Sequence, residues 1–323
     1  MKVVATNTII PLGDDVRTAF GDQVEFVEID GTTEEGLLAG TTDADALLVI
    51  NEQISRPVIE RLARCRSIVR FGIGFDTIDV GAATEHGIWV SNVPDANYRE
   101  VAVHAIALAL AVQRRLPALD AGMKSTGWSS SFAPGVRRPD VQTFGLYGLG
   151  RIGRRVATMA QAMGYRVIAH DPVLTPEVAA ELAVELVDRD ALLARSNILS
   201  LHVPLTESTR NIIDRDALAA MPAGAVLVNV SRGGLIDEQA LADALHSGHL
   251  FGAGIDAFAH EPTEDGNPLL ACESAILTPH AAHWSEESFA ETKRKVAEEA
   301  ARILRGEQPR SAVNVPLERV SAP

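Results

Sequence analysis

The chain has 323 residues, 46% of them hydrophobic and 22% charged, which is enough to bury more than one core, so we expect two domains. Lysine and arginine number 29 against 43 aspartate and glutamate, a net charge of −14, which argues against a nucleic-acid partner held through its phosphates. Cys65 and Cys272 are far apart and form no C-x-x-C pair, so we expect neither a disulfide framework nor a zinc site, and a cytoplasmic location.

The first hundred residues alternate short β-rich runs with helix-like segments. The run at 2–7 is strand-like and lacks the longer apolar core of a signal peptide, and no apolar run is long enough to span a bilayer, so we expect no membrane partner. Further strands are predicted at 24–29, 46–50, 67–71 and 88–92, with helices at 57–64 and 76–85. This alternation predicts a parallel α/β sheet that forms a domain of its own.

An alanine- and leucine-rich helix is predicted over residues 101–116. The segment is apolar nearly all round, so several of its faces must be covered. Burial within the monomer and a homodimer interface are about equally favoured by this pattern, and we predict a homodimer that forms through this region. The following stretch at 125–139, rich in serine, glycine and proline, is predicted to be a surface loop.

A strand, a glycine turn and a helix follow near the centre of the chain, from Thr143 onward. Gly148, Gly150 and Gly153 have the G-x-G-x-x-G spacing of a dinucleotide-binding turn, in which glycines allow backbone N–H groups to approach a pyrophosphate. The next strand ends at Asp171, at the distance expected for a carboxylate that binds an adenosine ribose. An acid there would repel a 2′-phosphate, so NAD is predicted rather than NADP. A turn without a ligand, or Asp171 as a simple strand-end cap, is the less favoured alternative.

Strands at 198–203, 225–230 and 252–257, with helices between them, are predicted to continue a doubly wound sheet. The last long helix, at 286–305, has a stop signal in Gly306 and Pro309. Because a complete sheet precedes the glycine turn, the segment at 312–315 is predicted to cross back to the first lobe. The cofactor domain would then be an insertion.

Three residues in the second half have the chemistry required for hydride transfer at a carbonyl carbon. That reaction needs a cation for a carboxylate, an acid/base for the oxygen and a group that tunes the acid/base. Arg232 follows an apolar strand, Glu261 lies in A-H-E-P, and His280 lies in L-T-P-H-A-A-H-W. Each has a plainer interpretation, as a helix cap or surface ion pair, an exposed turn and a structural histidine. His280 and His283 have no third ligand near in sequence, so no metal is expected.

Together these motifs resemble those of the D-2-hydroxyacid dehydrogenase family over nearly the whole chain. The matching segments are R-F-G-I-G-F-D at 70–76, the glycine turn, L-H-V-P-L at 201–205, N-V-S-R-G-G at 229–234, G-I-D at 254–256, E-P at 261–262 and P-H-A-A at 279–282. Within the family, the likeness is greatest to the C-terminal binding protein subgroup. The resemblance implies an α/β fold with two Rossmann- or flavodoxin-like doubly wound parallel sheets. The substrate domain would comprise 1–97 and 286–323, and the inserted NAD-binding domain 98–285.

The resemblance also implies a role for each matching residue. Arg232 would bind the carboxylate and carbonyl of a 2-oxo acid, His280 would exchange a proton with the carbonyl oxygen, and Glu261 would hold the imidazole. The implied substrate-binding residues are Arg70, Gly72, Ile73, Gly74 and Trp284. The implied NAD-binding residues are Gly148, Gly150, Arg151, Ile152, Gly153, Asp171, Val203, Val230, Ser231 and Asp256.

The favoured interpretation is therefore an NAD-dependent D-2-hydroxyacid dehydrogenase that acts on a small anionic 2-oxo acid. The C-terminal binding proteins have a tryptophan directly after H-A-A, but this chain has His283 there and Trp284 one place later, so a preference for bulky substrates does not follow. Asn51 stands where phosphoglycerate dehydrogenases have an arginine, which removes one expected phosphate contact. The alternatives are an NAD(H)-sensing, corepressor-like binding protein and a phosphoglycerate dehydrogenase. A formate dehydrogenase is disfavoured because Glu261 stands where that branch has glutamine.

Overall fold

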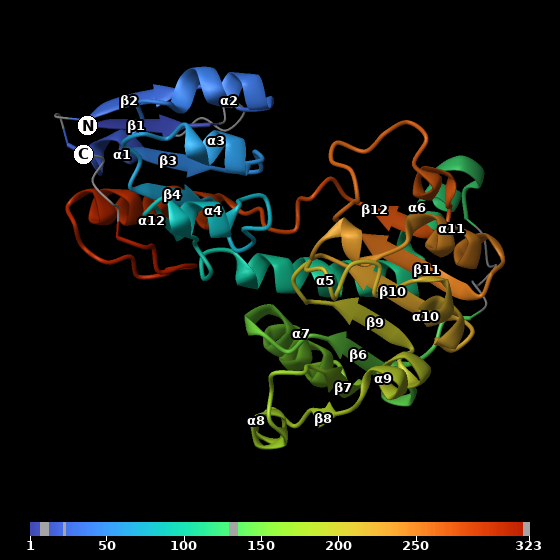
Figure 1. Cartoon of the computed structure of the whole chain (residues 1–323). Helices are drawn as coiled ribbons and strands as arrows, with labels where there is room; N and C mark the ends of the chain where they lie inside the picture. The colour runs from blue at the N-terminus through green and yellow to red at the C-terminus, as the bar shows by residue number, and fades with distance from the viewer. Residues whose placement is uncertain (7–12, 22–23, 129–134, 319–323) are drawn as a thin grey trace. The chain divides into compact units, whose positions relative to one another are not determined.

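The chain folds into two α/β units, each built on its own parallel sheet (Figure 1). The computed structural model describes residues 1–6, 13–21, 24–128 and 135–318. One unit comprises Met1–Asn97 with Ser285–Pro323, and the other comprises Tyr98–Trp284. The units divide at 97/98 and 284/285, where the sequence analysis placed the breaks at 97/98 and 285/286. Both sheets are parallel throughout, so the predicted fold class is confirmed.

The first unit has a five-stranded sheet in the order β2-β1-β3-β4-β5, the flavodoxin-like arrangement. Its strands are β1 (Lys2–Ala5), β2 (Glu25–Glu28), β3 (Ala46–Val49), β4 (Ser67–Arg70) and β5 (Trp89–Ser91). Its helices are α1 (Gly13–Thr18), α2 (Glu34–Thr41), α3 (Arg56–Glu60), α4 (Val80–Glu85) and α12 (Glu286–Leu304). Alternate strand residues enter two separate apolar cores, one of them shared with α12, so both faces of the sheet are covered.

The polypeptide after α12 lies along β5 of the same sheet. Val313 N–H donates to the carbonyl of Val90, and Ala312 forms an isolated antiparallel bridge with Ser91. The side chain of Asn314 adds three hydrogen bonds, to Val90, Thr84 and Ile88. The C-terminal part of the chain therefore belongs to the sheet that the N-terminal part builds, and the second unit is an insertion in sequence.

The second unit has a seven-stranded sheet in the order β12-β11-β10-β9-β6-β7-β8. Its strands are β6 (Thr143–Tyr147), β7 (Arg166–His170), β8 (Glu185–Leu186), β9 (Ile198–Leu201), β10 (Ala225–Asn229), β11 (Leu250–Ile255) and β12 (Ala275–Leu277). Its helices are α5 (Tyr98–Gln113), α6 (Leu116–Thr126), α7 (Arg151–Ala162), α8 (Pro176–Glu181), α9 (Arg189–Arg195), α10 (Arg215–Ala220) and α11 (Glu238–His246). The strand order reverses between β6 and β9, and ligands of open α/β sheets bind at the carboxyl ends of strands flanking such a point.

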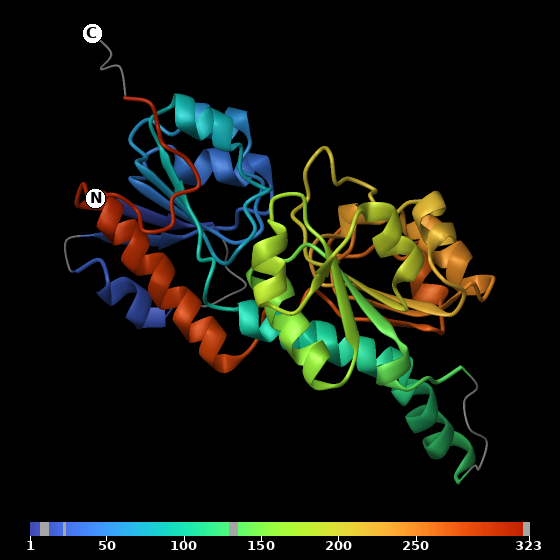
Figure 2. The same ribbon diagram turned by 90° about the horizontal axis from the view of Figure 1, so that it is seen from below.

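The helix predicted at 101–116 is α5, and half of its residues are buried within its own unit. It packs with α7 against the apolar core on one side of the sheet, while Val103 remains 56% exposed. The left-handed backbone of Arg115 (φ 53°) ends this run, and α6 continues at an angle of 54° (Figure 2). Over the described residues, no single helix has both the length and the composition needed to cross a membrane, although α5 and α6 pass that test as a bent pair.

Helix α6 was not predicted from the sequence, and it extends two residues into the segment predicted to be a loop. None of its residues is buried, so no packing against the rest of the unit marks its position. A proline in its first turn is the one local signal for a helix start. Residues 129–134 of the predicted loop lie outside the described residues.

Candidate active site

The loops that follow β10, β11 and β12 carry the three predicted catalytic residues. Arg232 follows β10, Glu261 follows β11 and His280 follows β12. These three strands are neighbours in the sheet and are parallel, so their carboxyl ends lie at one edge. Topology therefore brings side chains that are up to 48 residues apart in sequence into one region.

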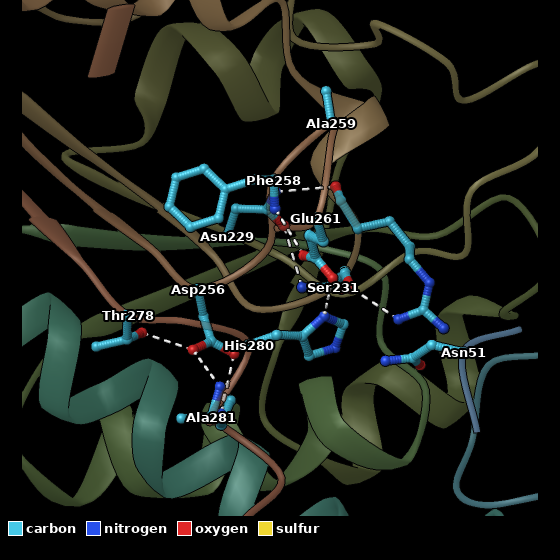
Figure 3. A network of polar contacts seen from close by, with 12 residues as sticks. Asn51, Asn229, Ser231, Asp256, Phe258, Ala259, Glu261, Thr278, His280 and Ala281 are labelled. Atoms are coloured by element: carbon cyan, nitrogen blue, oxygen red, sulfur yellow. Dashed lines mark hydrogen bonds and ion pairs between the residues drawn. The ribbon is translucent and has the colours of Figure 1, made fainter. Parts of the chain in front are cut away.

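His280 and Glu261 form a short hydrogen bond at this edge of the sheet (Figure 3). Nδ1 of His280 lies 2.7 Å from Oε2 of Glu261, and the other carboxylate oxygen accepts the backbone N–H of Phe258 at 2.9 Å. An ionised carboxylate can only accept hydrogen bonds, so Nδ1 carries the proton. The ring nitrogen Nε2, on the other edge of the imidazole, is the one that can exchange a proton with a ligand.

The environment keeps the Glu261 carboxyl ionised. Burial by itself would raise the pKa of Glu261, and the hydrogen bond and charge of His280 oppose it by lowering the pKa. The N–H of Phe258 and the guanidinium of Arg232 lower it further, so the pKa lies below the ordinary value of a glutamate. At neutral pH the site therefore has a negative charge in contact with the imidazole.

The backbone of His280 has φ 52°, a left-handed conformation that costs about 1 kcal/mol or more for a residue with a Cβ. Asp256, directly after β11, holds the chain in this turn. Its carbonyl accepts the N–H of His280 at 2.8 Å, and its carboxylate accepts the N–H groups of Ala281 at 2.8 Å and Ala282 at 3.0 Å. The carboxylate also accepts the hydroxyl of Thr278 at 2.5 Å. The orientation of His280 is thus determined by the buried side chain and carbonyl of Asp256.

Arg232 lies in a loop that the buried side chain of Asn229 organises. Asn229 Nδ2 donates to the carbonyl of Arg232 at 2.9 Å, and its Oδ1 accepts the N–H of Ser231 at 3.1 Å. The next residue, Gly233, lies directly against the loop that carries Glu261, because a Cβ there would be 1.8 Å from the carbonyl carbon of Phe258. The two loops are therefore in backbone contact, which fixes the arginine loop beside the glutamate loop.

The glycine turn has the form that a bound pyrophosphate requires. Gly148 has φ 97°, and a Cβ on Gly153 would lie 2.3 Å from the carbonyl oxygen of Gly148, so both positions need glycine. A Cβ on Gly150, in contrast, would meet nothing within 4 Å, so the space above the start of α7 is open. The first turn of α7 includes Arg151 and Ile152, contains no acidic residue and has no side-chain cap. Its N–H groups and helix dipole can therefore receive an anion.

Asp171, predicted to bind the ribose, lies beside this turn at the end of β7. Its two carboxylate oxygens accept the N–H of Leu149 at 2.8 Å and the N–H of Val173 at 3.0 Å. The carboxylate therefore anchors the glycine turn, and its remaining lone pairs can accept hydrogen bonds from a ligand. Asp171 thus acts as a strand-end cap, and it also stays able to bind a ribose.

The other predicted cofactor residues lie at the carboxyl ends of neighbouring strands. They are Val203 after β9, Val230 and Ser231 after β10, and Asp256 after β11. The side chain of Val203 lies 2.9 Å from where a Cβ of Gly148 would be, and Ser231 Oγ donates to the carbonyl of Leu201. The first contact places Val203 beside the glycine turn, and the second ties Ser231 to the end of β9. With the open space at Gly150 and the uncapped start of α7, this edge of the sheet fits a dinucleotide.

The predicted carboxylate site around Arg70 lies in the first unit, at the end of β4. Gly72 has φ 111°, and a Cβ there would overlap the Arg70 guanidinium. Arg70 donates to the carbonyl of Phe71 and, at 3.2 Å, to Oδ1 of Asn51. Ile73 and Gly74 follow, partly exposed, in the same loop. Trp284 is the last residue of the second unit, and its side chain is 56% exposed.

Two contributors to the site were missed in the sequence analysis. Asn229 and Thr278 lie within quoted motifs, but their hydrogen bonds depend on tertiary contacts that the motifs do not specify. Within the described parts of the chain, no three histidine, cysteine, aspartate or glutamate side chains gather as ligands for a metal. The rings of His280 and His283 are 6.1 Å apart in an edge-to-face arrangement.

Comparison with known proteins identifies the family. Residues 106–282 match the model of the D-isomer specific 2-hydroxyacid dehydrogenase NAD binding domain. The chain belongs to this family. It is 42% identical to the D-3-phosphoglycerate dehydrogenase of Mycobacterium tuberculosis over 92% of its own length and 56% of the relative's. It is 38% identical to the glyoxylate reductase of Korarchaeum cryptofilum over 87% of its length and 86% of the relative's.

A solved structure of similar form is the glyoxylate reductase from Paecilomyes thermophila, with a TM-score of 0.87, 31% identity and coverage of 97% of this chain and 98% of that one. The chain spans a little over half the length of the phosphoglycerate dehydrogenases that it matches. The second unit contains the NAD-binding domain of the family. The predicted family is thereby confirmed, whereas the likeness to C-terminal binding proteins stays a prediction.

The contact at Gly233 gives a test of how the site is held together. In the variant Gly233→Ala, the new methyl group must separate the arginine loop from the glutamate loop, so we expect a loss of roughly 2 kcal/mol or more in the free energy of unfolding. In the control Gly234→Ala, the methyl group meets the ends of two flexible side chains, Leu205 at 3.0 Å and Arg210 at 3.5 Å, so its loss should be smaller. Urea denaturation measures both, and equal stabilities of the two variants would contradict the assigned contact.

A pH prediction comes from His202, whose backbone supports Gly148. Its Nε2 lies 3.0 Å from Ser200 Oγ, and its Nδ1 is buried with no partner among the described residues. Burial lowers the pKa of His202 to about 3, so the folded form stays neutral while the unfolded chain binds a proton below 6.5. Stability is therefore lost as the pH falls below 6.5, by roughly 2 kcal/mol between pH 7 and pH 5.

The variant His202→Gln replaces the ring nitrogen with an amide nitrogen that cannot titrate. It should therefore lose less stability over this pH interval than the parent chain. His260→Gln, at an exposed position, is the control and should leave the pH dependence unchanged. The measurement is the free energy of unfolding from urea denaturation at pH 7 and pH 5. The same pH dependence in His202→Gln and the parent chain would remove His202 as the source.

Proposed function

We propose that this protein is an NAD-dependent oxidoreductase that interconverts a small 2-oxo acid and a D-2-hydroxy acid. The observation that carries the proposal is the 2.7 Å hydrogen bond between His280 and Glu261 at the carboxyl edge of a dinucleotide-binding sheet. That pair provides an acid/base whose tautomer is defined, and Arg232 provides a cation in the adjoining loop. The glyoxylate reductases and phosphoglycerate dehydrogenases among the relatives support this class of reaction.

In the proposed mechanism, the glycine turn, the start of α7 and Asp171 hold NAD(H). When bound, this cofactor supplies or accepts the hydride. Arg232 binds the substrate carboxylate through its planar guanidinium, which orients the carbonyl group. Nε2 of His280 donates a proton to the carbonyl oxygen during reduction and removes it from the hydroxyl during oxidation. Glu261 stabilises the imidazolium and keeps Nδ1 protonated.

We further propose that Arg70 and the backbone around Gly72, Ile73 and Gly74 contribute to carboxylate binding. Exposed backbone N–H groups of a glycine-rich loop form a suitable anion site. Val203, Val230, Ser231 and Asp256 complete the proposed NAD-binding set, and Trp284 the substrate-binding set. Cys65 and Cys272 are both buried thiols, which supports a proposed cytoplasmic location.

Substitution of the proposed acid/base tests the function directly. His280→Ala should lower the turnover of a 2-oxo acid with NADH by roughly 10²–10⁴ while NADH binding, followed by fluorescence, is retained. Glu261→Gln should lower turnover less, because its amide oxygen can still accept the Nδ1 hydrogen bond of His280 but carries no negative charge. The neighbouring exposed His260→Gln should behave as the parent chain. Full activity of His280→Ala would exclude the proposed role.

A second candidate function is that of a phosphoglycerate dehydrogenase, which the 42% identity to such enzymes favours. The two candidates differ in whether the substrate carries a phosphate. Asn51, held by Arg70, is neutral and gives no charge for a phosphate. Comparison of kcat/KM for glyoxylate, hydroxypyruvate and 3-phosphohydroxypyruvate distinguishes them. NADH binding with no turnover of any 2-oxo acid would instead favour the corepressor-like alternative.

We propose that the chain forms a homodimer through the region of α5 and α6. The apolar side chains of α6 are exposed, with Leu116 at 53%, Leu119 at 45% and Met123 at 50%, and Val103 of α5 is also exposed. A second copy of the chain would cover this surface. Light scattering should give twice the 34.5 kDa of the chain, and Leu119→Glu with Met123→Glu should give a monomer. Val173→Glu, at an exposed apolar position elsewhere, is the control.

A further inference from the structure

Helix α5 lies unusually close to strand β11, and glycines make this approach possible. A Cβ on Gly252 would lie 2.6 Å from Val112, and a Cβ on Gly254 would lie 2.7 Å from Cβ of Leu108. Both distances are shorter than a real Cβ allows, so only glycine fits these two positions while α5 lies this close to β11.

These contacts also set a register between the helix and the strand. Two residues along a strand span about 6.6 Å, and four residues along a helix span about 6.0 Å. Each step of two residues along β11 therefore matches a step of four residues back along α5. Gly252 faces Val112, Gly254 faces Leu108, and the next position, 256, should face position 104. The next pair along is Asp256 with His104, and His104 Nε2 indeed lies 3.6 Å from Oδ1 of Asp256. The glycines thus bring the histidine of α5 to the buried carboxylate.

The hydroxyl of Thr278 connects these two side chains. It lies 2.5 Å from Asp256 Oδ1 and 3.0 Å from His104 Nε2. Its single proton is donated to the carboxylate, so the hydroxyl oxygen must accept from His104, whose Nε2 therefore carries a proton. His104, Thr278 and Asp256 form a directed chain of hydrogen bonds that ends on the acid holding the His280 turn.

We propose that His104 is a positioning residue for His280, acting through Thr278 and Asp256. The activity part of this proposal rests on the function proposed above. By fixing the hydroxyl of Thr278, His104 keeps the Asp256 carboxylate oriented toward the N–H groups of Ala281 and Ala282. The turn then keeps its left-handed conformation, and the imidazole keeps its bond to Glu261. A core histidine with only a packing role would not need a donor at this position.

Hydrogen exchange of the chain without ligand tests the proposal independently of any activity. Exchange is followed by mass spectrometry on a peptide spanning residues 279–284. His104→Leu and Thr278→Val, which remove the donor and the hydroxyl, should raise exchange in this peptide. His104→Gln and Thr278→Ser, which keep these groups, should retain protection.

The control variant is His249→Leu in the same unit, where Nε2 bonds to the carbonyl of Leu218 away from the turn. It should leave exchange in the 279–284 peptide unchanged, even if it lowers global stability. Unchanged exchange in His104→Leu, or an equal rise in His249→Leu, would overturn the proposal.

Kinetics with NADH and an accepted 2-oxo acid provide the second measurement. His104→Leu and Thr278→Val should each lower kcat about tenfold, with KM for NADH changed by less than about twofold, because the loss is in the placement of His280. The double variant should be no slower than either single variant, since both break one chain. His104→Gln should recover most of kcat. Independent, multiplying losses, or no recovery in His104→Gln, would overturn the proposal.

The two proposals fail in distinguishable ways. If the parent chain turned over no 2-oxo acid, the proposed function would be wrong, and hydrogen exchange alone would decide the role of His104. If the parent chain were active and the 279–284 peptide exchanged equally in the parent chain and in His104→Leu, only the role of His104 would be wrong.

Discussion

The carboxylate of Asp256 is fully buried, so the protein must supply the hydrogen bonds that water would otherwise make. It does so with two backbone N–H groups of the turn after β12 and with the hydroxyl of Thr278. The cost of burying this charge is thereby converted into a geometric constraint, because the turn cannot relax without exposing an unsatisfied anion. The placement of His280, and through it the pairing with Glu261, depends on this one buried acid.

The remaining features of the second unit supply what that turn needs. Parallel strands in the Rossmann order bring the loops after β10, β11 and β12 to one edge, and the missing side chain at Gly233 lets two of those loops touch. Glycines likewise form the turn before α7, where open space and unsatisfied N–H groups coincide. In each case, glycine is required by a close approach or an unusual backbone angle rather than by flexibility.

Much of this could be predicted from the sequence, because the signals were local. The β-rich runs gave strands, and the glycine spacing, the apolar helix stripe and Asp171 together indicated the dinucleotide turn. Helix α6 and the short strands β8 and β12 escaped prediction, since they have few buried residues to create a pattern. The contact between His104 and Thr278 joins residues 174 positions apart, and no periodicity encodes such a pair. Its only trace is the alternation of Gly252, Gly254 and Asp256, which acquires meaning once α5 is placed above the strand.

That alternation has a consequence for how the sequence of this unit can vary. Gly252 and Gly254 of β11 and Asp256 directly after it each face a particular residue of α5. A larger side chain at one of these positions would have to be matched by a smaller one at the facing helix position. Single substitutions would be rejected one by one, whereas paired substitutions could preserve the spacing. We therefore expect the strand and the helix to change together among related sequences, as a coupled block that sets the depth of the helix.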